Sequence, residues 1–252
     1  MNTVVIIPAR LGSSRLPGKV LLDICGKPMV QHVYEAAKKA DGIDGVYIAT
    51  DSDEVRVTCE KFTANVIMTD TKHESGTDRL AEAVAKLTCE NVINVQADEP
   101  LIDPKLITLL AKTLKDEATQ MVSAMHKLNS TAELKSPNAV KVTVDKYSNA
   151  LYFSRSVIPH HRDNWEALLN HHETIPEPLN FFKHIGIYGY KKEFLQKYAS
   201  MEQTYLEKLE KLEQLRVLEN GYKIKMIETE YEPVGVDVQE DLEKVRELMQ
   251  CS

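Results

Sequence analysis

The stretch Pro8-Ala9-Arg10-Leu11-Gly12-Ser13-Ser14-Arg15-Leu16-Pro17-Gly18-Lys19 directly follows an apolar run, VVII, at residues 4–7. Such a run is typical of a first parallel strand that is buried on both faces. The loop after that strand opens into the crevice of an α/β sheet, where nucleotides bind. Arg10, Arg15 and Lys19 stand in this loop among small residues, which let backbone N–H groups approach an anion. The sequence therefore predicts a polyphosphate-binding loop.

The loop differs from the two common phosphate-binding motifs. Gly12 and Gly18 are one residue too far apart for G-x-x-x-x-G-K-[ST], Val20 follows the lysine, and G-x-G-x-x-G is missing. A solvated basic loop is the alternative interpretation. The position directly after a first strand favours phosphate binding.

The composition is that of a globular protein with an acidic surface. With 252 residues, 43% hydrophobic and 27% charged, the chain can bury the core of one α/β domain. The formal charge of −7 argues against nucleic acid as a partner, because such binding relies on basic surface. No run approaches 18 apolar residues, so no membrane contact is expected.

The four cysteines, Cys25, Cys59, Cys89 and Cys251, are scattered and form no C-x-x-C pair. Neither a zinc site nor a disulfide framework is indicated, so free thiols are expected. We therefore predict a cytoplasmic protein.

Strand and helix patterns alternate over the first hundred residues. Strands are expected at 4–7, 46–49, 66–68 and 92–95, and helices at 28–40, 54–62 and 77–87. Alternating runs at 139–144, 150–154 and 185–190 predict further, partly antiparallel strands. The pattern indicates one α/β domain with a doubly wound, mostly parallel Rossmann-like sheet and a mixed-strand second lobe. The approximate lobes are 1–120, which contains the predicted nucleotide-binding loop, and 121–252.

The second half contains two segments that are harder to interpret. Residues 159–179 hold two histidine pairs but no regular period, so we expect a long irregular excursion, a flap or a dimer arm, with surface histidines favoured over a metal site. Thr204 and Glu207 form a capping-box pattern that predicts one helix ending near Asn220-Gly221. Glu213 lies on an apolar face of that helix and is either an edge salt bridge or a substrate-binding group.

Five motifs resemble those of the sugar nucleotidyltransferases that activate acidic sugars with CTP. The first is P-A-R-x-x-S-[ST]-R-[LF]-P-x-K at the N-terminus. The other four are Ser75-Gly76-Thr77-Asp78-Arg79, Asn94-Val95-Gln96-Ala97-Asp98-Glu99-Pro100, Ala150-Leu151-Tyr152-Phe153-Ser154-Arg155 and Leu212-Glu213-Gln214-Leu215-Arg216. The resemblance spans essentially the whole chain. It implies a nucleotide-diphospho-sugar transferase type of fold and favours the substrate-binding interpretation of Glu213.

The resemblance also implies an activity and its partners. An anomeric hydroxyl of an acidic sugar would attack the α-phosphate of CTP, giving a CMP-sugar and pyrophosphate. The first candidate for that sugar is 3-deoxy-D-manno-octulosonate (Kdo), used in lipopolysaccharide biosynthesis. Magnesium is the implied cofactor, and a homodimer is the implied assembly. Sugar binding and dimerisation would fall to the lobe at 121–252.

Residue roles follow from matching positions. The catalytic residues would be Lys19, Asp98 and Asp237, with Mg²⁺ held by the two aspartates. CTP would contact Arg10, Ser14, Arg15, Lys19, Ser75, Gly76, Thr77 and Arg79. The sugar would contact Gln96, Arg155, His184, Tyr188, Glu213 and Gln214.

Physical chemistry weighs differently on these assignments. Asp98 follows a strand, where ligands bind, although it could be an ordinary turn residue. Asp237 precedes an apolar-periodic helix and could simply cap it. A guanidinium fork such as that of Arg155 suits a carboxylate. His184 and Tyr188 would by themselves indicate core packing.

Two positions depart from the family pattern, and three rival functions remain. Ala97 stands where glycine is common, and Tyr205 stands where proline is common. The added methyl group of Ala97 opens the identity of the acid to an 8-amino-Kdo, another acidic sugar or a phosphonate. A non-catalytic nucleotide-binding domain would not need both aspartates. A glycosyltransferase would use a D-x-D motif such as Asp51-Ser52-Asp53, for which helix capping is the simpler explanation.

Overall fold

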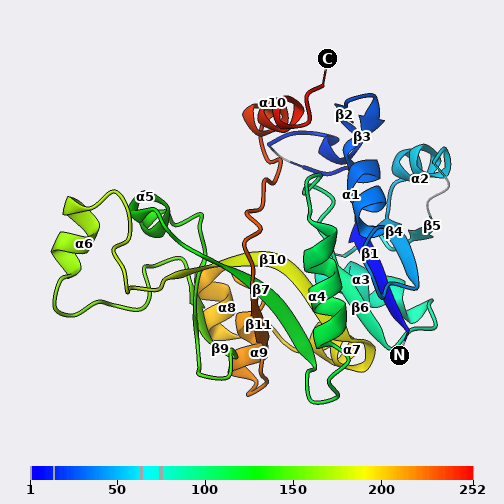
Figure 1. Ribbon diagram of the computed structural model, residues 1–252. Helices are drawn as coiled ribbons and strands as arrows, with labels where there is room; N and C mark the ends of the chain where they lie inside the picture. The colour runs from blue at the N-terminus through cyan, green and yellow to red at the C-terminus, as the bar shows by residue number, and fades with distance from the viewer. Residues whose placement is uncertain (1, 14, 63–64, 74–75, 252) are drawn as a thin grey trace.

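Within residues 2–13, 15–62, 65–73 and 76–251, which the computed structural model describes, nine strands form one sheet (Figure 1). Its main path runs in the order β11-β7-β10-β6-β1-β4-β5, and β8 and β9 extend it beside β10. The strands are β1 (Thr3–Pro8), β4 (Gly45–Thr50), β5 (Asn65–Met68), β6 (Asn91–Asn94), β7 (Met121–Lys127), β8 (Lys141–Val144), β9 (Ala150–Ser154), β10 (Phe182–Lys191) and β11 (Lys225–Glu228).

The sheet is mixed, as expected. Strand β1 pairs in parallel with β4 and β6, and β4 pairs in parallel with β5. Strand β10 lies antiparallel between β6 and β7, whereas β11 is parallel to β7. The predicted α/β class with a mostly parallel sheet is confirmed. Because β10 pairs with β6, both halves of the chain share one sheet, and the lobe boundary near residue 120 stays a prediction.

Helices cover both faces of the sheet. Successive β1 side chains point to opposite faces, so each face presents apolar side chains that a helix can bury. Val5 and Ile7 pack in one core with α1 (Met29–Ala37), α2 (Asp53–Glu60) and α4 (Pro104–Thr113). Val4 and Ile6 pack in the other with α3 (Gly76–Ala85), α7 (Lys192–Ala199) and α9 (Leu215–Glu219). Each fully buried aliphatic side chain of this kind contributes about 1.5–3 kcal/mol through apolar burial.

The late helix is two helices rather than the single one expected. Helix α8 (Tyr205–Glu210) ends at Lys211, whose φ of 56° is left-handed, and α9 begins at Leu215. The break folds the chain back, so that Glu219 of α9 accepts a hydrogen bond from the Leu206 amide of α8 at 2.9 Å. Glu207 and Arg216 form a buried ion pair between the two helices, with Oε2 and Nε 2.8 Å apart. Leucine spacing alone does not reveal such tertiary partners.

The segment 159–179 is not irregular throughout, because it contains α6 (Trp165–His171). Leu168 of α6 packs with Leu134 of α5 (Thr131–Lys135) and with Phe181 in a separate small core. Figure 1 shows α5 and α6 projecting to one side of the sheet. A role for this arm as a flap or in dimerisation stays a prediction. No helix of the described part of the chain is long and apolar enough to cross a membrane.

The expectation of four free thiols is wrong, since Cys25 and Cys251 form a disulfide. Helix α10 (Gln239–Leu248) packs on the hairpin of β2 (Asp23–Ile24) and β3 (Lys27–Pro28), with Ile24, Leu242 and Val245 in a third core. This packing brings the two cysteine Cα atoms to 4.9 Å across 226 residues of sequence. Cys59 and Cys89 remain free thiols.

Candidate active site

A pocket of about 310 Å³ opens at the carboxyl ends of β1 and β6. The phosphate loop, the turn after β6 and the segment before α10 supply its walls. The lining residues are Pro8, Arg10, Gly12, Ser13, Arg15, Lys19, Val20, Gln96, Ala97, Asp98 and Asp237. The phosphate loop, Asp98 and Asp237 therefore meet at one pocket, as the sequence indicated. The pocket combines three cationic side chains with two carboxylates.

Lys19 lies at the centre of this group. Gly18, with a φ of 65°, turns the chain into the short 3-10 helix η1 (Lys19–Leu21). The Nζ atom of Lys19 lies 2.6 Å from Oδ2 of Asp98, 2.9 Å from Oδ1 of Asp237 and 3.0 Å from the carbonyl oxygen of Val236. These three acceptors match the three protons of the ammonium group.

The protonation of this cluster follows from its contacts. Burial of Lys19 opposes its charged form, but the charges and hydrogen bonds of Asp98 and then Asp237 outweigh burial and raise the pKa of Lys19. Burial alone would raise the pKa of Asp237, yet Lys19 and then Arg15 lower it. Lys19 and Asp237 are therefore both charged at neutral pH.

Asp237 does not cap the following helix, which was the alternative for this residue. Helix α10 starts after Val238, and Asp241 accepts hydrogen bonds from the amides of Asp237 and Val238 at 2.9 and 3.1 Å. The carboxylate of Asp237 is thereby left for Lys19 and for Arg15, whose Nη2 lies 3.1 Å from Oδ2.

The two aspartates fit the requirements of a divalent cation. Magnesium is commonly held by one or two carboxylates together with substrate phosphates. Oxygens of Asp98 and Asp237 already converge on one cation, the Lys19 ammonium, which marks a point where positive charge is stabilised. In the described part of the chain, no group of three or more His, Cys, Asp or Glu side chains is placed to hold a metal. The pair of aspartates would thus need phosphate oxygens to complete a coordination shell.

The other predicted CTP residues are distributed unevenly. Arg10 is exposed at the pocket, whereas Ser14 and Ser75 lie outside the described residues. Gly76 begins α3, and the Thr77 hydroxyl donates to Oε2 of Glu213 at 2.8 Å.

Arg79 is buried away from the pocket lining. Its Nη2 lies 2.6 Å from Oδ2 of Asp51, and the residue is 3% exposed. Ser52 caps α2 by accepting from the Val55 amide at 3.3 Å. Two residues of the D-x-D motif thus have structural roles, Asp51 in an ion pair and Ser52 as a helix cap. A direct contact of Arg79 with the nucleotide stays a prediction.

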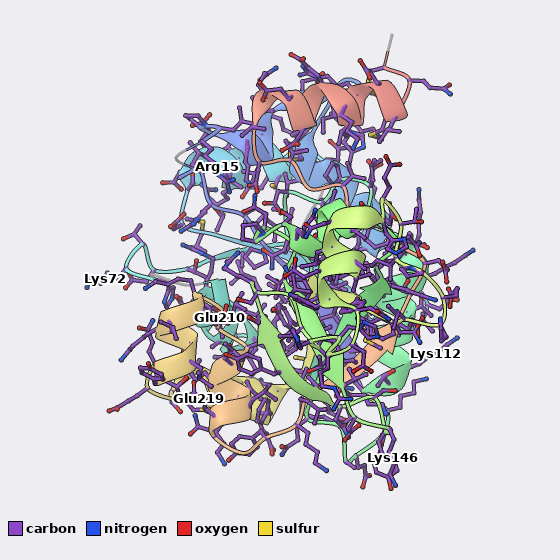
Figure 2. All side chains as sticks on the ribbon, turned by 90° about the vertical axis from the view of Figure 1, so that its left-hand side faces the viewer. Arg15, Lys72, Lys112, Lys146, Glu210 and Glu219 are labelled. Atoms are coloured by element: carbon purple, nitrogen blue, oxygen red, sulfur yellow. A yellow bond between two sulfur atoms is a disulfide. The ribbon has the colours of Figure 1, made fainter. Side chains whose placement is uncertain are left out.

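Arg155 is anchored to backbone and to Glu210 of α8. Its Nε donates to the Glu210 carbonyl at 2.9 Å, and its Nη1 donates to the Pro137 carbonyl at 3.0 Å. The Glu210 carboxylate accepts from the Arg155 amide at 3.0 Å and from Ser154 Oγ at 2.6 Å. In Figure 2, Arg15 lies near the end of the molecule that carries α10, and Glu210 lies farther from that end.

The remaining predicted sugar residues cluster around β10 and the start of α9. His184 and Tyr188 have ring centroids 5.4 Å apart, and Gln214 is buried as the residue before α9. Gln96 lines the pocket itself. Tyr188 faces Asn94 in the β10–β6 register, two residues before Gln96, so this cluster adjoins the carboxyl end of β6. The sugar roles of these residues stay predictions.

Sequence reasoning missed several supporting groups. The Val236 carbonyl on Lys19 carries no side-chain signal. Glu210 had no motif of its own, although the adjacent motif 212–216 could have directed attention to it. Asp51 was considered only as a metal ligand or a cap, not as the partner of Arg79.

The sequence and the fold are similar to those of known proteins. A family model described as Cytidylyltransferase matches residues 4–225. The chain is 47% identical over 250 residues to the 3-deoxy-manno-octulosonate cytidylyltransferase of Geotalea uraniireducens (strain Rf4), covering 99% of each chain. It is 49% identical over 251 residues to the protein of that name from Neisseria meningitidis serogroup C / serotype 2a, covering 98% of each. A solved structure of CMP:2-keto-3-deoxy-manno-octonic acid synthetase complexed with CTP superposes with a TM-score of 0.91, at 42% identity and 99% coverage of both chains.

Proposed function

This chain belongs to the cytidylyltransferase family, among the 3-deoxy-manno-octulosonate cytidylyltransferases, and we propose how its pocket carries out that activity. The enzyme transfers CMP from CTP to the anomeric hydroxyl of Kdo, releasing pyrophosphate. The convergence of Asp98 and Asp237 on Lys19, beside the exposed Arg10 and Arg15, is the observation that carries the proposal. The product, CMP-Kdo, would serve lipopolysaccharide biosynthesis.

The basic loop binds the triphosphate. Arg10 and Arg15 project from the loop at exposed positions, so phosphate oxygens can reach their guanidinium groups directly. Lys19 is more deeply placed, with a side chain 14% exposed, and it is held next to the carboxylates. From there its ammonium neutralises charge that develops on the α-phosphate during displacement. Ser14, Ser75, Gly76, Thr77 and Arg79 complete the proposed nucleotide contacts.

We propose that Asp98 and Asp237 would hold a divalent metal, Mg²⁺. When bound, such an ion neutralises phosphate charge and orients the reacting groups. The chain contributes two carboxylates of fixed position, because Val236 is tied to the Asp98 carbonyl through its amide at 2.9 Å. That hydrogen bond couples the turn after β6, which carries Asp98, to the segment before α10, which carries Asp237.

The sugar acid lies beyond the α-phosphate, between Gln96 and the β10 cluster. Arg155 binds its carboxylate, and His184, Tyr188, Glu213 and Gln214 contact its hydroxyls. The hydrogen bond from Thr77 to Glu213 supports this proposal, because it joins the nucleotide-binding helix α3 to the motif at 212–216. Substrates held in this way react mainly because they are positioned.

An alternative acid remains the second candidate, and one residue favours it. Ala97 is 4% exposed and lines the pocket one residue before Asp98. Its methyl group is a contact that a glycine would not make, so it can shift the preference toward an 8-amino-Kdo, another acidic sugar or a phosphonate. A non-catalytic nucleotide-binding domain would need no such pair of aspartates.

We also propose a single domain, a homodimer and a cytoplasmic location. The shared sheet supports the first of these. The other two stay predictions from the sequence, and the Cys25–Cys251 disulfide removes the free-thiol argument for the location at those two positions.

Pyrophosphate release by the purified protein tests the function. CTP, UTP, ATP and GTP are each combined with Kdo, its 8-amino analogue, sialic acid and a simple phosphonate, with Mg²⁺ present or chelated. We expect release only with CTP and Kdo, and only with the metal. Release with CTP and a different acid would move the sugar assignment, and no release with any pair would favour the binding domain.

A further inference from the structure

A buried serine lies behind the proposed sugar-binding residue His184, on the neighbouring strand. Ser123 of β7 is completely buried, and its Oγ lies 2.9 Å from Nε2 of His184. The same Oγ lies 2.9 Å from the carbonyl oxygen of Ile187 and 3.2 Å from that of Ile185. The register between β10 and β7 shifts between Ile185 and Tyr188. This irregularity turns two carbonyl groups and a ring nitrogen toward one hydroxyl group.

The single proton of Ser123 decides how these groups pair. Carbonyl oxygens only accept hydrogen bonds. If Ser123 donated to His184, both carbonyl oxygens would face the Ser123 oxygen with no proton between them. If Ser123 donates toward the carbonyls of Ile187 and Ile185, Nε2 of His184 must carry a proton and donate to Oγ. The second arrangement pairs every group, and buried polar groups are almost always paired.

His184 itself is neutral in this environment. Burial lowers the pKa of His184 to about 3. Its ring neighbours, Phe153 at 5.0 Å and Tyr188 at 5.4 Å, supply no negative charge. With one ring proton on Nε2, the other nitrogen, Nδ1, carries a lone pair. His184 is half-buried, and its hydrogen bond within the described residues is made through Nε2, so Nδ1 is left for a ligand.

We propose that Ser123 is a positioning residue that holds His184 in the Nε2–H tautomer, so that Nδ1 accepts a hydrogen bond from a hydroxyl of the sugar acid. This inference rests on the proposed function of the site. The Nε2–H tautomer also determines which group of the sugar acid His184 contacts, because the Nδ1 lone pair repels a carboxylate and attracts an O–H donor. His184 therefore selects a hydroxyl group, and the acid group is left to Arg155.

The tautomer can be measured without any substrate. Protein labelled with ¹⁵N-histidine gives separate signals for protonated and unprotonated ring nitrogens, and the spectrum of a His184→Gln variant identifies those of His184. At pH 7 we expect a protonated Nε2 and an unprotonated Nδ1. A protonated Nδ1 in the wild-type protein would overturn the proposal.

The Ser123→Ala variant tests the consequence for binding. Loss of the Oγ acceptor frees Nε2, so we expect a mixture of tautomers and a KM for Kdo that rises about tenfold, with the KM for CTP unchanged. Ser200→Ala is the matched control, because Ser200 Oγ also donates to a backbone carbonyl. Ser200 is exposed and is the C-cap residue of α7. An unchanged KM for Kdo in Ser123→Ala would overturn the proposal.

These measurements separate the inference from the proposed function. A wild-type protein that released no pyrophosphate would remove the proposed function and, with it, the sugar contact. The tautomer would still be decided by the spectrum of the substrate-free protein.

Discussion

The ammonium group of Lys19 lies 2.6 Å from the carboxylate of Asp98, although 79 residues separate them in sequence. A second carboxylate, from Asp237, lies 2.9 Å from the same nitrogen. One cation therefore joins the phosphate loop, the end of β6 and the segment before α10. This three-way contact makes the pocket a single electrostatic unit.

Replacing Asp98 by asparagine should abolish turnover while leaving the fold intact. The amide has nearly the same shape as the carboxylate, but it lacks the charge that we propose for metal binding. We expect the rate of pyrophosphate release at saturating Mg²⁺ to fall by at least about 100-fold. Far-ultraviolet circular dichroism should be unchanged.

Asp53→Asn is the control for this substitution. Asp53 is an exposed residue of α2 that pairs with Arg56, outside the pocket. Its variant should retain full activity. A near-normal rate for Asp98→Asn would exclude Asp98 as a metal ligand.

Reduction of the Cys25–Cys251 disulfide should destabilise the protein and slow turnover. The bond closes a loop of most of the chain, and such cross-links typically contribute about 2–5 kcal/mol to the free energy of unfolding. Because Asp237 directly precedes α10, loosening this helix should also lower activity. Chemical denaturation and pyrophosphate release, each with and without a dithiol reductant, measure the two effects.

Cys89→Ser supplies the comparison, since Cys89 is a partly buried free thiol. In Cys89→Ser, reductant should lower stability and activity as it does in the wild type, whereas Cys25→Ser should show no change on reduction. Four alkylated cysteines in denatured but unreduced protein, instead of two, would refute the disulfide.

Much of the fold was predictable because burial imposes a period on the sequence. The run at 4–7 becomes β1, whose alternate residues enter the two cores. The break at Lys211 was not predictable in this way. It depends on Glu219 reaching the amide of Leu206 and on the buried pair of Glu207 and Arg216, which are tertiary contacts.

The site shows the same division. Lys19 and Asp98 each stood in a recognisable motif, and Asp237 was assigned through the family resemblance, so their meeting could be expected. Cys25 and Cys251 had no motif, because their approach results from packing of α10 on a distant hairpin. Ser123 was invisible as well, since a serine in a strand gives no sign of the bulge opposite it.

Acid should remove a stabilising contribution that comes from Glu82. Its carboxylate accepts from Lys86 Nζ, the Asp70 amide and His73 Nε2 at 2.7, 2.8 and 2.6 Å. The hydrogen bonds from Lys86 and then from Asp70 lower the pKa of Glu82 from 4.5 to about 2. A lowered pKa in the folded state stabilises the protein above pH 4.5, and this stabilisation is lost as pH falls toward 2.

The Glu82→Gln variant should therefore be less stable than the wild type at pH 7 by about 1 kcal/mol, a value discounted because the side chain is partly exposed. The difference in unfolding free energy should shrink toward zero by pH 2, since glutamine does not titrate. Urea denaturation from pH 7 to pH 2 measures it, with Glu202→Gln as an exposed control. A difference that does not vary with pH would contradict the assignment.

Removing Lys19 should strengthen metal binding to the nucleotide-free enzyme even as it slows catalysis. The Lys19 ammonium uses oxygens of Asp98 and Asp237 that we propose for a divalent cation, so lysine and metal compete for them. In Lys19→Ala the two carboxylates keep only Arg15 as a cationic partner within the described residues, and their mutual repulsion favours a bound cation. We expect Mn²⁺ affinity, measured by electron paramagnetic resonance, to rise about tenfold, which corresponds to about 1.4 kcal/mol.

Lys27→Ala, which removes a lysine paired with Glu35 outside the pocket, should leave Mn²⁺ affinity unchanged. Weaker Mn²⁺ binding in Lys19→Ala would mean that the lysine and the metal do not share these carboxylates, and the two aspartates would then serve mainly to position Lys19.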